Sequence, residues 1–340
     1  DNVIIDYLPR FMKTYNMKYP FLSEQPKEKV KRFFFWLGYF FPNLTRYKKF
    51  MNFFDTQYRM TNCQYDEALL SKALFDFDTI VCESDVIWSP HSTQGFDNGF
   101  FCNLPSMRGK NKISYAACIG YTNFSEKRQA RFRELLKNFD SISVREIQGT
   151  EFTQEYTDKP VVNVLDPTLL LDKEDYNKIA APRKIQGDYI FLYSVYHDDK
   201  LLHTIRRMKK KWGMPIITLI SRNNSYKVLL NGIKLANEEG PEDFLGYIRY
   251  AKFVLTNSFH GSVFSMIYGK EFYYLGDYRQ DPRLKQLFTK AEIEHVGVTY
   301  EELEEQAGNF GLRGECDLSH KIADLRKSSE RYLKGALLQE

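Results

Sequence analysis

The chain has 340 residues and a mass of 40.2 kDa, a length that predicts about two domains at the usual ~100–200 residues each. Apolar residues make up 43% and charged residues 27% of the chain, which excludes a disordered or collagen-like protein. The 48 Lys and Arg against 44 Asp and Glu leave a net charge of +4. This balance excludes a protein that coats nucleic acid, so we expect no nucleic-acid partner.

The chain contains five cysteines and no C-x-x-C pair. This usage predicts neither a zinc site nor a disulfide framework, and it favours a reducing, cytoplasmic compartment. The longest apolar run, residues 33–41, covers ~9 residues, whereas a membrane-spanning helix needs ~20. We therefore expect no metal and no transmembrane segment.

Strand-like runs alternate with helical patterns along the chain, which is typical of βα units that build largely parallel sheets. The helical patterns include residues 125–138 and 241–251. The predicted strands are residues 3–7, 79–82, 112–118, 141–144, 161–164, 189–193, 216–220, 253–256 and 271–275.

Residues 168–187 lose this periodicity and gather Asp, Lys, Ala, Pro and Gly, so they are the predicted linker. The sequence therefore predicts an α/β protein with an N-terminal Rossmann-like domain, residues 1–175, and a C-terminal one, residues 186–335. Ligands of such open sheets bind where the carboxyl ends of the strands face a crevice. We expect the ligand site in a cleft between the two domains.

Residues 27–50 combine seven Lys and Arg with a run of aromatic residues. One interpretation is a peripheral contact with anionic lipid, to which each cation near the surface adds ~1 kcal/mol. The alternative is a solvated helix with a core face, interrupted at Pro42. The first interpretation would place a cytoplasmic protein at the inner face of the membrane.

The segment 253–269 gives the sharpest chemical signal. An apolar strand ending at Thr256 is followed by a small polar loop, and a helix is predicted to open at Ser262. His260 would stand at the carboxyl end of that strand, beside helix amides that favour negative charge. The pattern predicts an anion site with a proton donor, against the alternative of a structural His. The candidate anion ligands are Asn257, Ser258 and Gly261.

Two neighbouring strands also end in charged residues. Arg145 follows the strand at 141–144, where a guanidinium can clamp a phosphate or carboxylate with two hydrogen bonds. Neutralisation by Glu146 is the alternative. Asp166, which precedes Pro167 after the strand at 161–164, is predicted to be a turn residue that caps the next segment.

The strand at 79–82 leads into a loop that holds Asp85 and Trp88. A carboxylate beside an indole is a common way to hold a sugar, since the acid accepts hydroxyl protons and the ring packs on C–H faces. The sequence contains no G-x-x-x-x-G-K-[ST], G-x-G-x-x-G, G-x-S-x-G or H-E-x-x-H motif. It therefore disfavours a P-loop NTPase, a dinucleotide oxidoreductase, an α/β-hydrolase and a zincin.

These segments, in this order, resemble the polysaccharide pyruvyl transferase family. The resemblance spans roughly residues 2–290 and includes Ser-Val-Arg-Glu at 143–146 and Thr-Asn-Ser-Phe-His-Gly at 256–261. The blocks that carry it are residues 85–90, 112–120, 143–146, 166–171 and 256–265. Five blocks in the family's order are far more specific than any one of them.

The resemblance implies a two-domain fold like that of the GT-B glycosyltransferases. It also implies transfer of pyruvate from phosphoenolpyruvate onto two hydroxyls of a sugar, as a ketal, with no cofactor beyond that donor. The sugar would belong to a bacterial-type surface polysaccharide or its lipid-linked precursor. The N-terminal domain would bind this acceptor, and the C-terminal domain the donor.

The resemblance further implies that Arg145 and His260 lie at the donor site, and the chemistry of ketal formation and the residue types then predict the individual roles. His260 would be the general acid/base, while Arg145 and the helix amides after Gly261 would bind the donor. Asp85 would orient or deprotonate the acceptor hydroxyl, and Trp88 would contact the sugar.

The chain departs from the family's pattern in two places. Some branches carry Arg where this chain has Ser258, so Arg222 and Arg283 are the candidates for the missing cation. Family chains usually begin with a further strand and a Gly/Asn loop ahead of residues 3–7, and part of the cleft would be missing without them. The alternatives are a nucleotide-sugar glycosyltransferase of the same fold and a non-catalytic protein of polysaccharide assembly.

Overall fold

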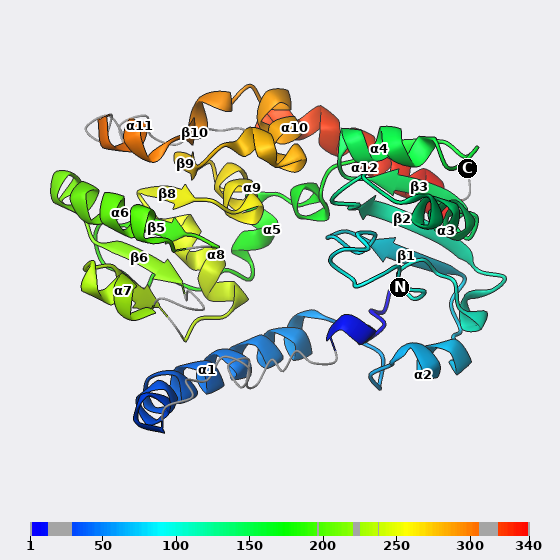
Figure 1. Ribbon diagram of the computed structural model, residues 1–340, viewed down its shortest axis with the longest axis horizontal. Coiled ribbons are helices and arrows are strands. Elements are labelled where there is room, and N and C mark those ends of the chain that lie inside the picture. Colours follow the sequence, from blue (N-terminus) through cyan, green and yellow to red (C-terminus); the bar gives the residue numbers. More distant parts are fainter. Residues whose placement is uncertain are drawn as a thin grey trace. The chain divides into compact units, whose positions relative to one another are not determined.

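The computed structural model describes residues 2–12, 29–195, 197–219, 225–236, 238–305 and 319–338. The chain divides into two compact units, coloured by sequence in Figure 1. The first unit comprises residues 1–15, 59–171 and 322–340, and the second comprises residues 16–58 and 172–321.

The boundary after Leu171 lies within the predicted linker, but the units are not two continuous halves of the chain. Helix α12 (Ser319–Leu338) belongs largely to the first unit. Its Tyr332 hydroxyl donates to the Ser114 carbonyl at 2.9 Å, and the Leu165 amide donates to Ser329 Oγ at 2.9 Å. A helix that docks on strands far away in the chain leaves no local signal in the sequence.

A four-stranded parallel sheet in the order β1-β2-β3-β4 forms the centre of the first unit. The predicted strand at 3–7 is present only as two isolated bridges, Ile4 with Met60 and Tyr7 with Tyr65. The strands are β1 (Thr79–Glu83), β2 (Asn111–Ala117), β3 (Ser141–Val144) and β4 (Val161–Asn163). The other helices are α2 (Glu67–Lys72), α3 (Glu126–Leu136) and α4 (Ile147–Gln154).

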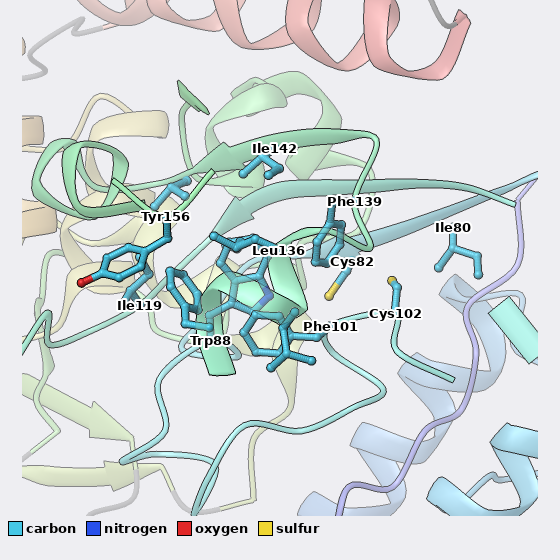
Figure 2. Close-up of a cluster of buried hydrophobic side chains, with 14 of the residues drawn as sticks. Ile80, Cys82, Trp88, Phe101, Cys102, Ile119, Leu136, Phe139, Ile142 and Tyr156 are labelled. Carbon is cyan, nitrogen blue, oxygen red and sulfur yellow. The ribbon is translucent and has the colours of Figure 1, made fainter. Parts of the chain in front are cut away.

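Aromatic rings fill the core of this unit. Trp88 stacks on Phe101 with ring centroids 5.1 Å apart, and Phe132 meets both rings edge-on at 6.0 Å. Figure 2 shows Trp88 and Phe101 enclosed by Leu136 and Phe139. Burial of such large apolar side chains is the main stabilising contribution to the sheet and its covering helices.

The second unit is built on a six-stranded parallel sheet in the order β10-β9-β8-β5-β6-β7. Its strands are β5 (Ile190–Tyr193), β6 (Ile216–Leu219), β7 (Lys234–Ala236), β8 (Phe253–Thr256), β9 (Phe272–Leu275) and β10 (Gly297–Val298). The helices in its described part are α1 (Lys29–Gln57), α5 (Lys173–Asn177), α6 (Asp199–Trp212), α7 (Ser225–Leu230), α8 (Pro241–Tyr250), α9 (Phe259–Ile267), α10 (Pro282–Lys290) and α11 (Tyr300–Glu305).

This strand order is that of a Rossmann sheet. The chain builds β5, β6 and β7 outward in one direction, then returns to place β8 beside β5 and continues outward the other way. The reversal between β5 and β8 is the point at which open α/β sheets bind their ligands, at the carboxyl ends of the strands. The prediction of two Rossmann-like α/β units is confirmed; the cleft between them stays a prediction.

Helix α1 continues through Pro42, so the predicted interruption there is wrong. A proline removes one backbone hydrogen bond, but the helix beyond it is held by ion pairs. Lys49 Nζ contacts Glu239 at 2.5 Å and Asp243 at 2.8 Å, and Lys184 pairs with the same two carboxylates. Lys49 therefore pairs with carboxylates of the protein itself. The membrane contact of residues 27–50 stays a prediction, which now rests on the other basic residues of that segment.

Candidate functional site

The turn between β8 and α9 differs in one respect from the sequence prediction. The helix begins at Phe259 rather than at Ser262, because Ser258 is its N-cap and its Oγ accepts from the Gly261 amide at 3.5 Å. The Ser258 carbonyl in turn accepts from the Ser262 amide at 3.1 Å. His260 is therefore the second residue of the helix, half-buried at the carboxyl end of a central strand.

Gly261 is needed for packing. A Cβ at this position would lie 2.1 Å from Oγ1 and 2.9 Å from Cβ of Thr256, closer than atoms can approach without a backbone shift. The amides of Gly261 and Ser262 already bond to Ser258. The helix cap thus engages these groups within the protein, and phosphate binding by Gly261, Ser258 and the amides after them stays a prediction.

Asn257 and Thr256 tie this turn to the end of β5. The Asn257 side-chain oxygen accepts from the Val195 amide at 2.7 Å. Thr256 Oγ1 donates to the Tyr193 carbonyl at 2.7 Å and accepts from the Ser258 amide at 3.0 Å. These bonds bridge the β5–β8 reversal, so they hold His260 at the place where a Rossmann sheet binds its ligand.

Arg283, one of the two predicted extra cations, lies next to the same turn. Its guanidinium carbon lies 4.8 Å from the centroid of the Phe259 ring, and that ring meets the His260 imidazole edge-on at 5.2 Å. Two hydrogen bonds to Asp281, at 2.9 and 2.7 Å, fix the orientation of the guanidinium. Burial opposes the charged Asp281, but Arg283 outweighs it and lowers the pKa of that carboxyl. Arg222 lies outside the described residues.

His197 is a residue of this edge that the sequence prediction missed. It follows β5 and is buried, with Nε2 3.1 Å from Thr218 Oγ1. Burial lowers the pKa of His197 to about 4, so its imidazole is neutral at neutral pH. The only sequence signal for it is its position between a strand and the helix N-cap Asp198.

The carboxyl edge of the first unit contains a buried ion cluster. Arg145 Nη1 donates to Asp166, and Arg145 Nε lies 3.4 Å from Glu146. The three side chains are 3%, 2% and 6% exposed, in the order Arg145, Asp166, Glu146. The prediction of an open arginine clamp is therefore wrong. Asp166 caps the following turn, as predicted, by accepting from the Thr168 amide at 3.0 Å.

The reason for this pairing is the sheet itself. Strands β3 and β4 are parallel neighbours, so their carboxyl ends deliver Arg145 and Asp166 to the same edge. The cluster therefore holds two carboxyl groups for one guanidinium. The guanidinium retains its proton, because the surrounding acidic groups outweigh the burial that opposes its charge and raise its pKa.

Strained backbone gathers at the same edge. Ser84 and Asp85, after β1, have φ values of 43° and 54°, and the buried Ala116 in β2 has a φ of 53°. Such left-handed conformations of residues other than glycine are costly and cluster at functional sites. Asp85 is exposed, and its neighbour Ser84 places Oγ 3.5 Å from Asp166. Asp85 thus lies at the edge where the sequence predicts it.

Trp88 does not lie in a sugar site, contrary to the prediction. The side chain is 0% exposed, and its indole N–H donates to the Phe100 carbonyl at 3.1 Å inside the core. Figure 2 shows it surrounded by apolar side chains. An indole with no accessible face cannot stack on a sugar.

No group of three or more His, Cys, Asp or Glu could hold a metal ion within the part of the chain that the structure describes. None of the helices in that same part is both long and apolar enough to cross a membrane.

The fold and the two carboxyl edges define a protein of the GT-B type, with parallel α/β units that each present polar residues at their strand ends. The chain belongs to the polysaccharide pyruvyl transferase family, whose model matches residues 9–277. It is therefore a transferase of polysaccharide metabolism. No curated protein matches the chain.

Solved structures of similar fold include a Listeria monocytogenes protein described as a UDP-N-acetylglucosamine 2-epimerase. It has a TM-score of 0.52 and 12% identity, over 83% of this chain and 86% of that one. The UDP-N-acetylglucosamine 2-epimerase of Methanocaldococcus jannaschii has a TM-score of 0.44 and 14% identity, over 77% and 78%. The glycosyltransferase AviGT4 of avilamycin A biosynthesis has a TM-score of 0.44 and 15% identity, over 79% and 76%. At 12% identity, the similarity to the Listeria monocytogenes protein supports the fold and not a shared function.

Proposed function

We propose that the protein transfers pyruvate from phosphoenolpyruvate to two hydroxyls of a saccharide, as a ketal, in a surface polysaccharide or its lipid-linked precursor. Family membership supports a transferase that acts on polysaccharide. The observation that favours the second unit as the donor side is that Arg283 lies over the Phe259 ring and His260 meets the same ring edge-on, at the carboxyl edge of the sheet.

The reaction needs an acid and an anion clamp. Phosphoenolpyruvate carries a phosphate and a carboxylate, and the planar guanidinium of Arg283 matches either group. Imidazole is the side chain that ordinarily exchanges a proton near neutral pH, so His260 would protonate the methylene carbon. Positive charge then develops on the neighbouring carbon, where one sugar hydroxyl attacks. Inorganic phosphate leaves, and the second hydroxyl closes the ketal.

The first unit would bind the acceptor. Its edge holds two carboxyl groups, Glu146 and Asp166, for one cation, Arg145, an acidic surplus that disfavours a polyanionic donor beside it. Arg145 is accordingly assigned as a positioning residue that holds Asp166 and Glu146. The exposed carboxylate of Asp85 would orient or deprotonate the acceptor hydroxyl.

Incubation with phosphoenolpyruvate and a panel of methyl hexosides tests the proposal. The expected products are one pyruvate ketal and one inorganic phosphate per turnover, detected by mass spectrometry and a phosphate assay. Turnover of uridine or guanosine nucleotide sugars, with no phosphate release from phosphoenolpyruvate, would identify a glycosyltransferase instead. A non-catalytic assembly protein would consume neither donor, and loss of His260 would then leave cellular pyruvylation unchanged.

A further inference from the structure

A long basic stretch of the second unit has no part in the proposed reaction. Residues 200–237 contain nine Lys and Arg and no Asp or Glu, although acidic and basic residues are nearly balanced in the whole chain. Strand β6, helix α7 and strand β7 lie within this stretch, as does helix α6 apart from its first residue, Asp199. Figure 1 shows α6, β6 and α7 next to one another. Lys200, Arg207 and Lys227 pair with carboxylates, so the excess positive charge of the stretch rests on its other cations.

The described part of this stretch forms an open hollow of about 740 Å³. Its cationic lining comes from Arg206, Lys209 and Lys210 of α6 and from Lys234 of β7, and no acidic residue lines it. Ile216, where β6 begins, also lines the hollow. The hollow thus lies at the amino ends of the strands, the opposite edge of the sheet from His260.

The cations of the hollow are available for a ligand. Arg206, Lys210 and Lys234 are exposed, and none of them has a carboxylate partner within the described ranges. Lys209 donates to the Gly232 carbonyl, so a peptide oxygen rather than an acid holds it. Unpaired cations on a concave surface focus the potential that attracts an anionic partner.

Apolar side chains project beside these cations. Leu229 is 57% and Leu230 74% exposed, and Leu230 itself lines the hollow together with Pro215. These two exposed leucines add apolar area beside the basic surface. A ligand that consists of a phosphate group alone would not cover that area. Cations that meet headgroups and leucines that enter the acyl boundary are the two elements of an interfacial membrane contact.

We propose that this basic patch, defined as Arg206, Lys209, Lys210, Leu229, Leu230 and Lys234, docks the protein on an anionic lipid bilayer. Charge complementarity selects the anionic surface, and the exposed leucines select a bilayer over a nucleic acid. The contact is distinct from the one predicted for residues 27–50. It is also independent of the proposed reaction, because lipid binding requires no donor or acceptor.

Vesicle sedimentation tests the patch. The full chain is mixed with vesicles of phosphatidylcholine and phosphatidylglycerol, or of phosphatidylcholine alone, and the partition coefficient is measured at low and high salt. The patch variant carries Arg206→Glu, Lys210→Glu and Lys234→Glu. The matched control carries Lys72→Glu, Lys127→Glu and Arg128→Glu, which reverse exposed cations of the first unit and change the net charge equally.

The patch variant is expected to lower partition to the anionic vesicles by about a hundredfold, since each cation contributes ~1 kcal/mol, or roughly fivefold. The control is expected to lose no more than about tenfold. Leu229→Ser with Leu230→Ser should weaken binding in a way that high salt does not mimic, because salt screens charge and not apolar burial. Circular dichroism confirms that each variant is folded.

Three results would overturn the proposal. Equal loss in the patch and control variants would mean that net charge alone drives binding. Loss caused only by Arg46→Glu and Lys48→Glu would assign the membrane contact to α1. Binding of a single-stranded oligonucleotide that depends on the patch, with no binding of vesicles, would assign the surface to nucleic acid.

Discussion

The Arg283 guanidinium packs against the Phe259 ring, 4.8 Å from its centroid, and the His260 imidazole meets the same ring edge-on at 5.2 Å. Phe259 thus contacts both a cation, Arg283, and a candidate proton donor, His260, in the second unit. Asp281 holds the guanidinium with two hydrogen bonds, so its orientation is fixed before any ligand binds. Such preorganisation lowers the cost of binding a donor anion.

Arg283→Ala is expected to raise the KM for phosphoenolpyruvate at least about tenfold, because a bond between a guanidinium and an anion is worth ~1.5–3 kcal/mol. Arg279→Ala is the matched control. Arg279 makes the same kind of bond to Asp277, but its side chain is 70% exposed, against 26% for Arg283. Steady-state kinetics measure the KM for phosphoenolpyruvate of both variants. Equal KM values would show that Arg283 does not bind the donor.

His260→Gln is expected to lower kcat by about a hundredfold or more, since general acid catalysis contributes ~10²–10⁴ in rate. The KM for the donor should change little. His203→Gln, an exposed histidine of α6, serves as the control and should retain the parent rate. A His260→Gln enzyme that turns over at the parent rate would show that another group delivers the proton.

Arg145→Met is expected to destabilise the protein by about 3–5 kcal/mol, because it leaves two buried carboxylates without their cation. Adding Glu146→Gln and Asp166→Asn should recover most of that loss, since the buried negative charge is then removed. Urea unfolding of the single and triple variants measures both effects. A loss below about 1 kcal/mol for Arg145→Met would contradict a buried cluster.

Acid should destabilise the protein through His197. Burial lowers its pKa from 6.5 to about 4, so between these values the unfolded chain binds a proton that the folded one excludes. Stability should therefore fall as the pH decreases from about 6.5 to about 4, by up to about 3 kcal/mol from this group. His197→Gln should flatten the stability profile in that window, whereas His203→Gln should not. Parallel profiles for parent and His197→Gln would contradict the assignment.

The sequence predicted the local elements well and the side-chain environments poorly. Strands β3 and β8 begin and end at the predicted residues, because short apolar runs bounded by polar turns fix a buried parallel strand. The short strands β7 and β10 were missed, since neither has the largely apolar run that marked the similarly short β4.

Trp88 and Arg145 show where such prediction stops. The sequence places both near strand ends, but it cannot show that Phe101 covers the indole or that Asp166 neutralises the guanidinium. Both partners are distant in sequence and arrive only through strand order and helix packing. For Arg283 the structure supports the prediction. The sequence proposed it only as a replacement for the cation missing at Ser258, and the fold places it next to Phe259.

The most direct test of the account is a calorimetric titration of phosphoenolpyruvate into the parent protein and into the Arg283→Ala and Arg279→Ala variants, with uridine and guanosine nucleotide sugars titrated in parallel. We predict saturable binding of phosphoenolpyruvate to the parent and to Arg279→Ala, and binding at least about tenfold weaker to Arg283→Ala. Saturable binding of a nucleotide sugar, with no heat from phosphoenolpyruvate, would contradict the proposed donor.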